Sequence, residues 1–119
     1  MKDIDVTWKI FTTYILLIIF MLAAGMSRGQ IVVTHFNAEW NSPNKAEWVG
    51  DLKDCDISYV DITKSPKLQK NHKVIVVPTI IIFKDGEEVK RYQADVSFMM
   101  VATREELQEY IDELLMEDF

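Results

Sequence analysis

Few side chains in this 119-residue chain can act as nucleophiles or metal ligands. Cys55 is the sole cysteine, which excludes both an internal disulfide and a zinc site built from cysteines. His35 and His72 are the two histidines, and with a single thiol they form a poor ligand set for a transition metal. We therefore expect no metal and no cofactor, and the thiol of Cys55 is the candidate for covalent chemistry.

Two acidic residues, Asp54 and Asp56, flank Cys55. Negative charges beside a thiol raise its pKa, which lowers its reactivity. One interpretation is that Cys55 is a small, half-buried residue at the start of a strand. The other is that it forms a mixed disulfide with a partner.

The charge balance makes a nucleic-acid partner unexpected. The chain has 13 basic and 19 acidic residues, for a net charge of −6. No basic stripe that could follow a phosphate backbone is present.

An uncharged segment, residues 10–27, lies close to the start of the chain. Its 18 residues would span roughly 27 Å as a helix, close to the thickness of a bilayer core. Three interpretations remain open: a membrane anchor, a helix buried in the domain or against a partner, and a cleavable signal peptide. We predict an anchor region, 1–29, followed by a domain, 30–119, which the distribution of basic residues favours outside the cytoplasm.

Hydrophobic patterning predicts alternating strands and helices after residue 30. Residues 76–83 form a nearly continuous apolar run, which is typical of a strand buried on both faces. Thr103 and Glu106 have the spacing of a capping box, and an apolar stripe follows them. The predicted strands are 31–36, 56–62, 76–83 and 88–94. The predicted helices are 46–52, a short helix that begins at 65 and ends between 72 and 74, and 103–115.

Particular residues support these assignments. Ser65 and Pro66 are suited to begin a helix, and Asp85-Gly86 is suited to a two-residue hairpin turn. Ile57, Tyr59 and Val60 are expected near the core of their strand. The stripe of the last helix consists of Leu107, Tyr110, Ile111, Leu114 and Leu115.

Two separated motifs resemble the thioredoxin family. The segment from Val33 to Trp40 is similar to the strand that leads to that family's active site, and Val77-Pro78-Thr79 is similar to its cis-proline segment. The resemblance extends over residues 31–115. It implies an α/β thioredoxin-like fold, a central mixed sheet flanked by helices, here with an N-terminal hydrophobic helix. It also implies that a cis Pro78 faces the loop after Trp40.

The residues that perform the family's chemistry are replaced in this chain. Where the family has Trp-Cys-Gly-Pro-Cys-Lys, the sequence reads Trp40-Asn41-Ser42-Pro43-Asn44-Lys45. His35 lies where the resemblance places a buried acid. Because amides cannot act as thiol nucleophiles, we expect no dithiol chemistry at this loop.

The altered loop still suggests a place for a protein partner. The asparagines could cap the next helix, or they could present amides to a peptide added as an extended strand. The predicted groove consists of Trp40, Asn41, Ser42, Pro43, Asn44, Val77 and Pro78. Phe98, Met99 and Met100 form a second candidate contact patch, and they could equally pack on the sheet.

From these features we expect a redox-inactive, membrane-associated accessory or assembly subunit that binds a protein partner and is not an enzyme. The alternative is a thiol–disulfide redox protein or carrier that works through Cys55. A third possibility is a soluble protein whose first helix completes a larger complex.

Overall fold

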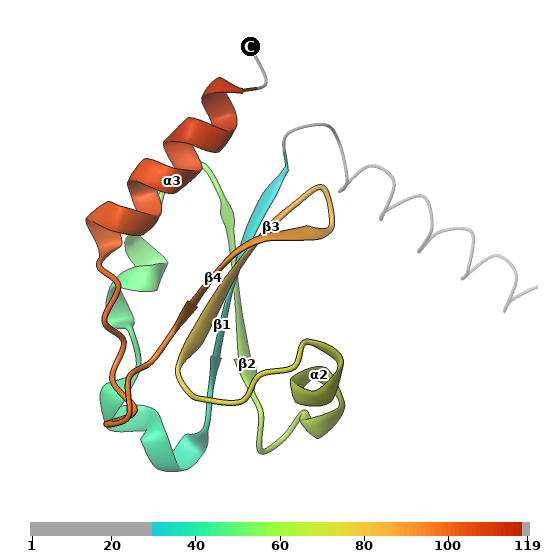
Figure 1. Ribbon diagram of the computed structural model, residues 1–119, viewed down its shortest axis with the longest axis vertical. Coiled ribbons are helices and arrows are strands. Elements are labelled where there is room, and N and C mark those ends of the chain that lie inside the picture. Colours follow the sequence, from blue (N-terminus) through green and yellow to red (C-terminus); the bar gives the residue numbers. More distant parts are fainter. Residues whose placement is uncertain (1–29, 118–119) are drawn as a thin grey trace, which may run out of the picture.

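A computed structural model describes residues 30–117, and the fold of this part is a sheet with helices on both sides (Figure 1). The predicted N-terminal hydrophobic helix, with its segment 10–27, lies outside the described residues. The elements in chain order are β1 (Ile31–Asn37), the 3₁₀ helices η1 (Glu39–Asn44) and η2 (Glu47–Asp51), β2 (Asp56–Asp61), α2 (Pro66–Asn71), β3 (Thr79–Lys84), β4 (Glu87–Gln93) and α3 (Arg104–Met116).

The four described strands form a single mixed sheet in the order β2-β1-β3-β4. β1 runs parallel to β2 and antiparallel to β3, and β3 and β4 form an antiparallel hairpin. Phe36, near the end of β1, pairs with Val60 of β2 and with Thr79 of β3. This arrangement confirms the expected α/β class with a mixed central sheet.

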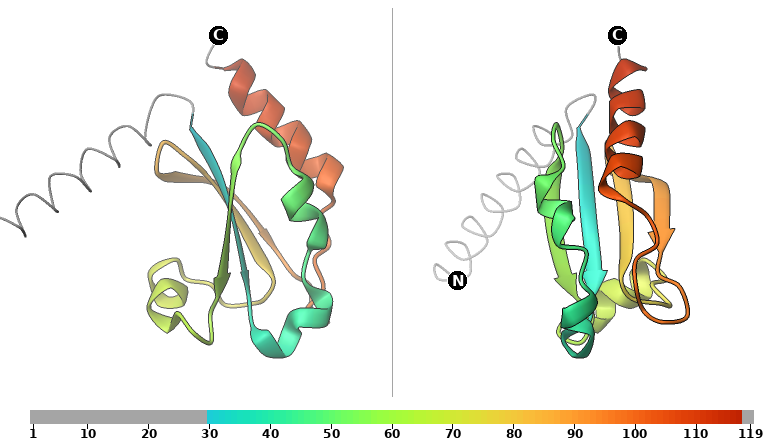
Figure 2. Two further views of the ribbon diagram at one scale, coloured as in Figure 1. Left: turned by 180° about the vertical axis from the view of Figure 1, so that it is seen from behind. Right: turned by 90° about the vertical axis from the view of Figure 1, so that its left-hand side faces the viewer.

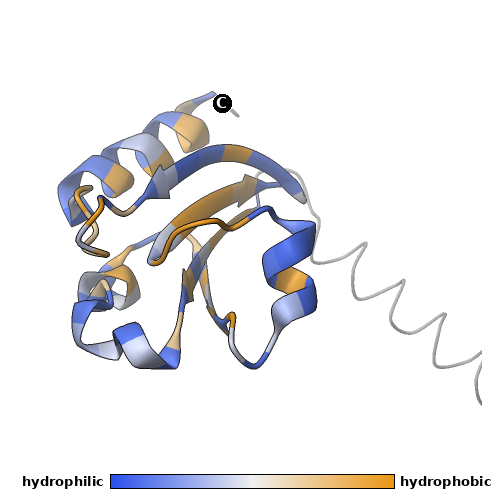
Figure 3. Ribbon diagram, turned by 60° about the horizontal axis from the view of Figure 1, so that its bottom comes forward, coloured by the Kyte–Doolittle hydropathy of each residue, from blue (hydrophilic) through white to orange (hydrophobic). Residues whose placement is uncertain are grey.

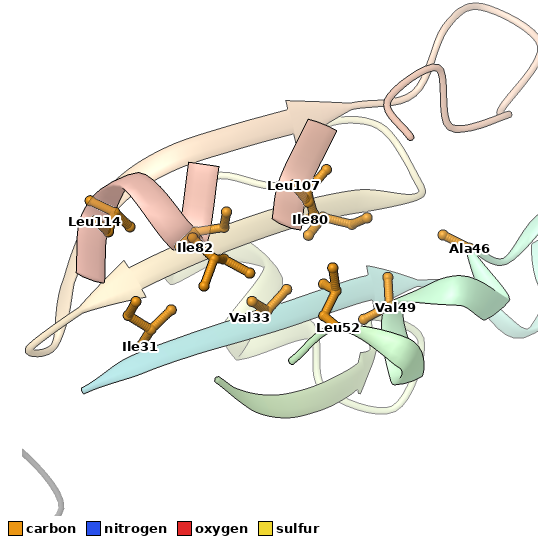
Figure 4. Packing of buried hydrophobic residues seen from close by; sticks show 10 residues of the cluster. Ile31, Val33, Ala46, Val49, Leu52, Ile80, Ile82, Leu107 and Leu114 are labelled. Carbon is orange, nitrogen blue, oxygen red and sulfur yellow. The ribbon is translucent and has the colours of Figure 1, made fainter. Parts of the chain in front are cut away.

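The helices cover opposite faces of the sheet. α3 and η2 lie on one side and α2 on the other, as the two views of Figure 2 show. The larger buried cluster joins the first face to α3 and η2 through residues such as Val33, Val49 and Leu107 (Figure 4). A smaller cluster on the other face includes Phe36, Val74 and Ile81.

The predicted apolar strand is central in the sheet, as its composition requires. Ile80, Ile81 and Ile82 of β3 are all fully buried, alternating between the two clusters. Figure 3 shows β3 as hydrophobic and the edge strand β4 as mainly hydrophilic. β3 begins only at Thr79, because Pro78 has no N–H to donate to a neighbouring strand.

The last helix follows its predicted pattern. Leu107, Ile111 and Leu114 are buried, while Tyr110 and Leu115 are half-buried against the same cluster. The Thr103 side chain accepts a hydrogen bond from the backbone N–H of Glu106, which caps the helix as expected.

Three local predictions are wrong. Residues 46–52 form a 3₁₀ helix rather than an α-helix, although Val49 and Leu52 are buried as expected. Tyr59 lies on β2, an edge strand among the described residues, and is 63% exposed. Ser65 makes no side-chain capping hydrogen bond, although Pro66 does begin α2.

Candidate functional site

The two motifs that are distant in sequence meet at one end of the sheet. The peptide bond between Val77 and Pro78 is cis, and Thr79 begins β3 immediately after it. Because Phe36 pairs with Thr79, the chain leaving β1 passes beside this segment. The loop formed by η1 is thereby placed against Val77 and Pro78.

The side chain of Asn41 holds this junction together. Its Nδ2 lies 3.3 Å from the Val77 carbonyl oxygen, 3.1 Å from the Phe98 carbonyl oxygen and 3.1 Å from Asn37 Oδ1. Three acceptors share two amide hydrogens, so at least one of these bonds is bifurcated. The amide therefore joins η1 to two segments that are 36 and 57 residues away in sequence.

Two further asparagines complete the network around Asn41. Asn44 Nδ2 donates to Asn41 Oδ1 at 2.9 Å, and Asn37 Nδ2 donates to the Asn41 backbone carbonyl at 3.2 Å. Asn41 itself is 3% exposed. Neither alternative from the sequence describes Asn41, because its amide neither caps η2 nor faces solvent where it could meet a peptide.

The residues of the predicted groove differ in accessibility. Val77 and Pro78 are buried, whereas Ser42 and Pro43 are exposed and Trp40 is 61% exposed. Val77 is therefore covered, whereas the Trp40 side of the loop is exposed.

A hairpin-like loop closes over the junction from the C-terminal side. Residues 94–100, which we call the strap, are closed at their base by pairing of Ala94 with Met100 and by a 3.1 Å hydrogen bond from the Asp95 N–H to the Met99 carbonyl. Inside the strap, the Asp95 carboxylate accepts hydrogen bonds from the backbone and hydroxyl of Ser97.

Phe98 is the residue of the strap that contacts the loop formed by η1. Its φ is 62°, a left-handed conformation that costs a non-glycine residue roughly 1–2 kcal/mol. Its ring packs edge-on against Trp40 with 5.3 Å between ring centroids. Of the predicted contact patch, Phe98 and Met99 are 42% and 54% exposed, whereas Met100 packs against the larger buried cluster.

His35 is a satisfied core histidine. It is 4% exposed, and its Nε2 accepts a 3.1 Å hydrogen bond from the Ala46 backbone N–H. Burial is the main cause that lowers its pKa below the usual 6.5. The neutral ring therefore fastens the start of the η2 segment to the middle of the sheet.

Cys55 lies at the other end of the sheet from the cis-proline segment. The next residue, Asp56, pairs with Val32, four positions before Phe36 in β1, so the thiol is separated from that segment by roughly 13–17 Å along the strand. The thiol is free and half-buried. Burial, followed by the charges of Asp56 and Asp54, raises its pKa from 9.0 to about 11.

Two contributing residues escaped the sequence interpretation. Asn37 belongs to the amide network, and the spacing of four and then three residues between Asn37, Asn41 and Asn44 was the available signal. Asp95 organises the strap, and Asp95 followed by Ser97 is typical of a side-chain-capped turn. Within residues 30–117 no group of three His, Cys, Asp or Glu side chains is arranged to hold a metal ion.

Comparison with known proteins identifies the family. The thioredoxin family profile matches residues 24–113, and the chain therefore belongs to the thioredoxin family. It is 37% identical over 67 residues to a thioredoxin of Chlamydia trachomatis, a match that covers 51% of this chain and 66% of that protein. It is 32% identical over 73 residues to a thioredoxin of Mycobacterium bovis, covering 56% of this chain and 63% of the relative. The match thus spans just under two thirds of these relatives.

Solved structures show the same fold. A thioredoxin of Nicotiana alata superposes with a TM-score of 0.56 at 20% identity, covering 79% of this chain and 81% of that one. The thioredoxin of Fasciola hepatica gives a TM-score of 0.52 at 24% identity, covering 72% and 82% respectively. Because the chain has only one cysteine, it lacks the C-x-x-C motif.

These findings correct two expectations from the sequence. The expectation of a redox-inactive, membrane-associated accessory subunit is wrong, because the matching relatives are named thioredoxins, which are redox proteins. The membrane-associated localisation is contradicted as well. Within the described residues no helix is long and apolar enough to cross a bilayer, and segment 10–27, on which that expectation depended, lies outside them.

Proposed function

We propose that this chain is a thiol–disulfide redox protein of the thioredoxin family that works as a single-thiol carrier through Cys55. The observation that carries the proposal is a free, partly accessible thiol on a chain whose family is thioredoxin. Asn41 and Asn44 supply no sulfur, so the exchange is a one-cysteine reaction and not a dithiol cycle. The partner of such a carrier is a protein or peptide that contains a disulfide.

The proposed step is a balanced exchange. The Cys55 thiolate attacks one sulfur of a partner disulfide, a Cys55–partner disulfide forms, and the second partner sulfur leaves as a thiolate. No external oxidant is consumed, because the partner disulfide is both the oxidant and the source of the leaving group. A second thiol that attacks the partner's sulfur completes the transfer and returns Cys55 to its thiolate.

The raised pKa makes this exchange slow without preventing it. A pKa of about 11 instead of 9.0 reduces the thiolate fraction near neutral pH by about 100-fold, while the greater nucleophilicity of a more basic thiolate recovers somewhat less than a factor of 10. The net rate is about tenfold below that of an ordinary thiol. A basic thiolate is also a poor leaving group, so the mixed disulfide persists, as a carrier requires.

Reaction with oxidised glutathione tests the proposal. Folded protein is expected to form one Cys55–glutathione disulfide per chain, detected by intact mass, with a rate that rises about tenfold per pH unit between pH 7 and 9. Transfer of the glutathione to an added reduced peptide should follow. Cys55→Ser must give no adduct.

The proposal would be overturned by a thiol that reacts only after unfolding. In that outcome the native chain forms no adduct over the pH range, whereas the same chain in denaturant forms it rapidly. Cys55 would then be a packing residue at the start of β2 and not a redox group.

A further inference from the structure

The strap, residues 94–100, covers the cis-proline segment at the point where Asn41 contacts both. Asn41 Nδ2 reaches the Phe98 carbonyl of the strap at 3.1 Å and the Val77 carbonyl at 3.3 Å. One buried side-chain amide therefore bridges the tip of the strap and the cis-proline segment, which are otherwise joined at the base of the strap by the 3.0 Å hydrogen bond from the Ala94 N–H to the Pro78 carbonyl.

From this contact we propose that the strap is an autoinhibitory latch. Asn41 holds it closed over the backbone of Val77, and an extended polypeptide segment binds there only after the strap opens. The inference does not use Cys55, and it goes beyond both the proposed thiol exchange and the groove predicted from the sequence because it assigns a gate that controls access to that groove.

The backbone groups of Val77 indicate which kind of ligand binds when the strap is open. The Val77 carbonyl is taken by a side chain rather than by a strand, and no described residue accepts a hydrogen bond from the Val77 N–H. A free donor and a releasable acceptor on one residue are the pair that an added extended strand uses. The exposed Trp40 ring, which packs against Phe98 of the strap, supplies apolar contact area.

The strap has features of an element that can be released. Phe98 adopts a left-handed backbone conformation, which an open strap would relieve. Val96 and Met99 are 99% and 54% exposed, so the tip of the strap is held mainly by the contacts of Phe98 with Asn41 and Trp40. The base of the strap is fixed separately, by the Ala94 N–H bond to the Pro78 carbonyl and by Met100 in the larger cluster. Its internal clasp, in which Asp95 accepts from the Ser97 and Met99 N–H groups, lets it move as a unit.

The Asn41→Asp variant tests the latch directly. It replaces the donating amide by a carboxylate oxygen that faces two carbonyl oxygens, so the strap is expected to open. Asn71→Asp, at the exposed end of α2, adds the same charge elsewhere and is the matched control. All chains carry Cys55→Ser, which removes any thiol reaction with the probe.

Two measurements define the outcome. In Asn41→Asp, exchange of the Val77 and Ala94 amide hydrogens, followed by NMR, should be at least about tenfold faster than in the control. The affinity for carboxymethylated insulin B chain, an extended probe with blocked cysteines, should rise at least about fivefold.

A second variant covers the case in which Asn41→Asp does not fold. Asp95→Ala removes the clasp at an exposed carboxylate outside the core, and it should give the same two changes. The inference is overturned if amide exchange is unchanged in the variant that folds, if exchange accelerates without tighter probe binding, or if the closed chain binds the probe equally well.

Discussion

At the residue scale, Asn41 and His35 show how replaced catalytic positions become structural ones. Asn41 forms hydrogen bonds to Val77, Phe98 and Asn37 through one amide. His35 accepts the Ala46 N–H from a buried position. The amide of Asn41 donates to backbone carbonyls and the ring of His35 accepts from a backbone N–H. A thiol forms weaker hydrogen bonds of both kinds.

His35 gives a prediction about stability and pH. Its pKa is lowered in the folded chain, so the unfolded state binds more protons as the pH falls below 6.5. The histidine's contribution to stability is therefore complete above pH 6.5 and is lost progressively as the pH falls toward the lowered value. Urea unfolding at pH 7.5 and at pH 5 should show lower stability at pH 5.

The matched variants isolate this residue. His35→Gln keeps a hydrogen-bond acceptor without a titrating group and should reduce the stability difference between the two pH values. His72→Gln, which leaves His35 in place, is the matched control. Other titratable residues line the same cleft as His35, namely Glu39, Lys45, Glu47, Tyr59 and Asp61. Both variants leave these residues unchanged. An unchanged pH dependence in His35→Gln would contradict the assignment.

At the scale of elements, α3 is a helix that its sequence specifies well. Its buried residues lie on one stripe and Thr103 closes its first turn. It covers the larger cluster together with η2 on one face of the sheet (Figure 4). The start of α3 also fixes where the strap ends, because only Val101 and Ala102 separate the strap from Thr103.

Replacing Thr103 by Ala should destabilise the chain by about 1 kcal/mol, the usual cost of losing a helix N-cap. Thr103→Ser retains an acceptor and should recover most of the loss. Thermal or urea unfolding of the three chains measures the difference. Equal stability of the Ala variant would show that the 3.2 Å hydrogen bond to Glu106 contributes nothing.

At the scale of the whole molecule, the sheet separates two sites. The amide network and cis Pro78 are at one end, and Cys55 is at the other. The thiol chemistry we propose is therefore spatially separate from the strap and the cis-proline segment. The cis proline is at the first end, whereas the thiol is at the second.

This geometry predicts that dithiol chemistry can be restored. Asn41 and Asn44 side chains already contact each other at 2.9 Å, so Asn41→Cys with Asn44→Cys should form an internal disulfide. In a Cys55→Ser background, the double variant should reduce insulin with dithiothreitol at least about tenfold faster than Asn41→Cys alone. Failure to form the disulfide in folded protein would show that η1 does not preserve the family's loop geometry.

How much could be predicted depended on whether the signal was local. The strands, the buried β3 run and the α3 stripe follow from periodicities of two and 3.6 residues within short windows. The 3₁₀ form of η2 and the exposure of Tyr59 did not follow, because they depend on neighbours from other parts of the chain. The resemblance of two motifs supplied the mixed central sheet and the cis proline, whereas the order of the strands in the sheet came from the structure.

The sequence by itself determined the class of fold, the position of the loop and the absence of a second thiol. The tertiary structure decided that Asn41 bridges Val77 and Phe98, that Phe98 of the strap packs against Trp40 and that Cys55 lies at the far end of the sheet. The hydrophobic pattern of a short stretch of sequence specifies which face of a helix or strand is apolar. Contacts between segments 36 and 57 residues apart exist only once the sheet has brought them together.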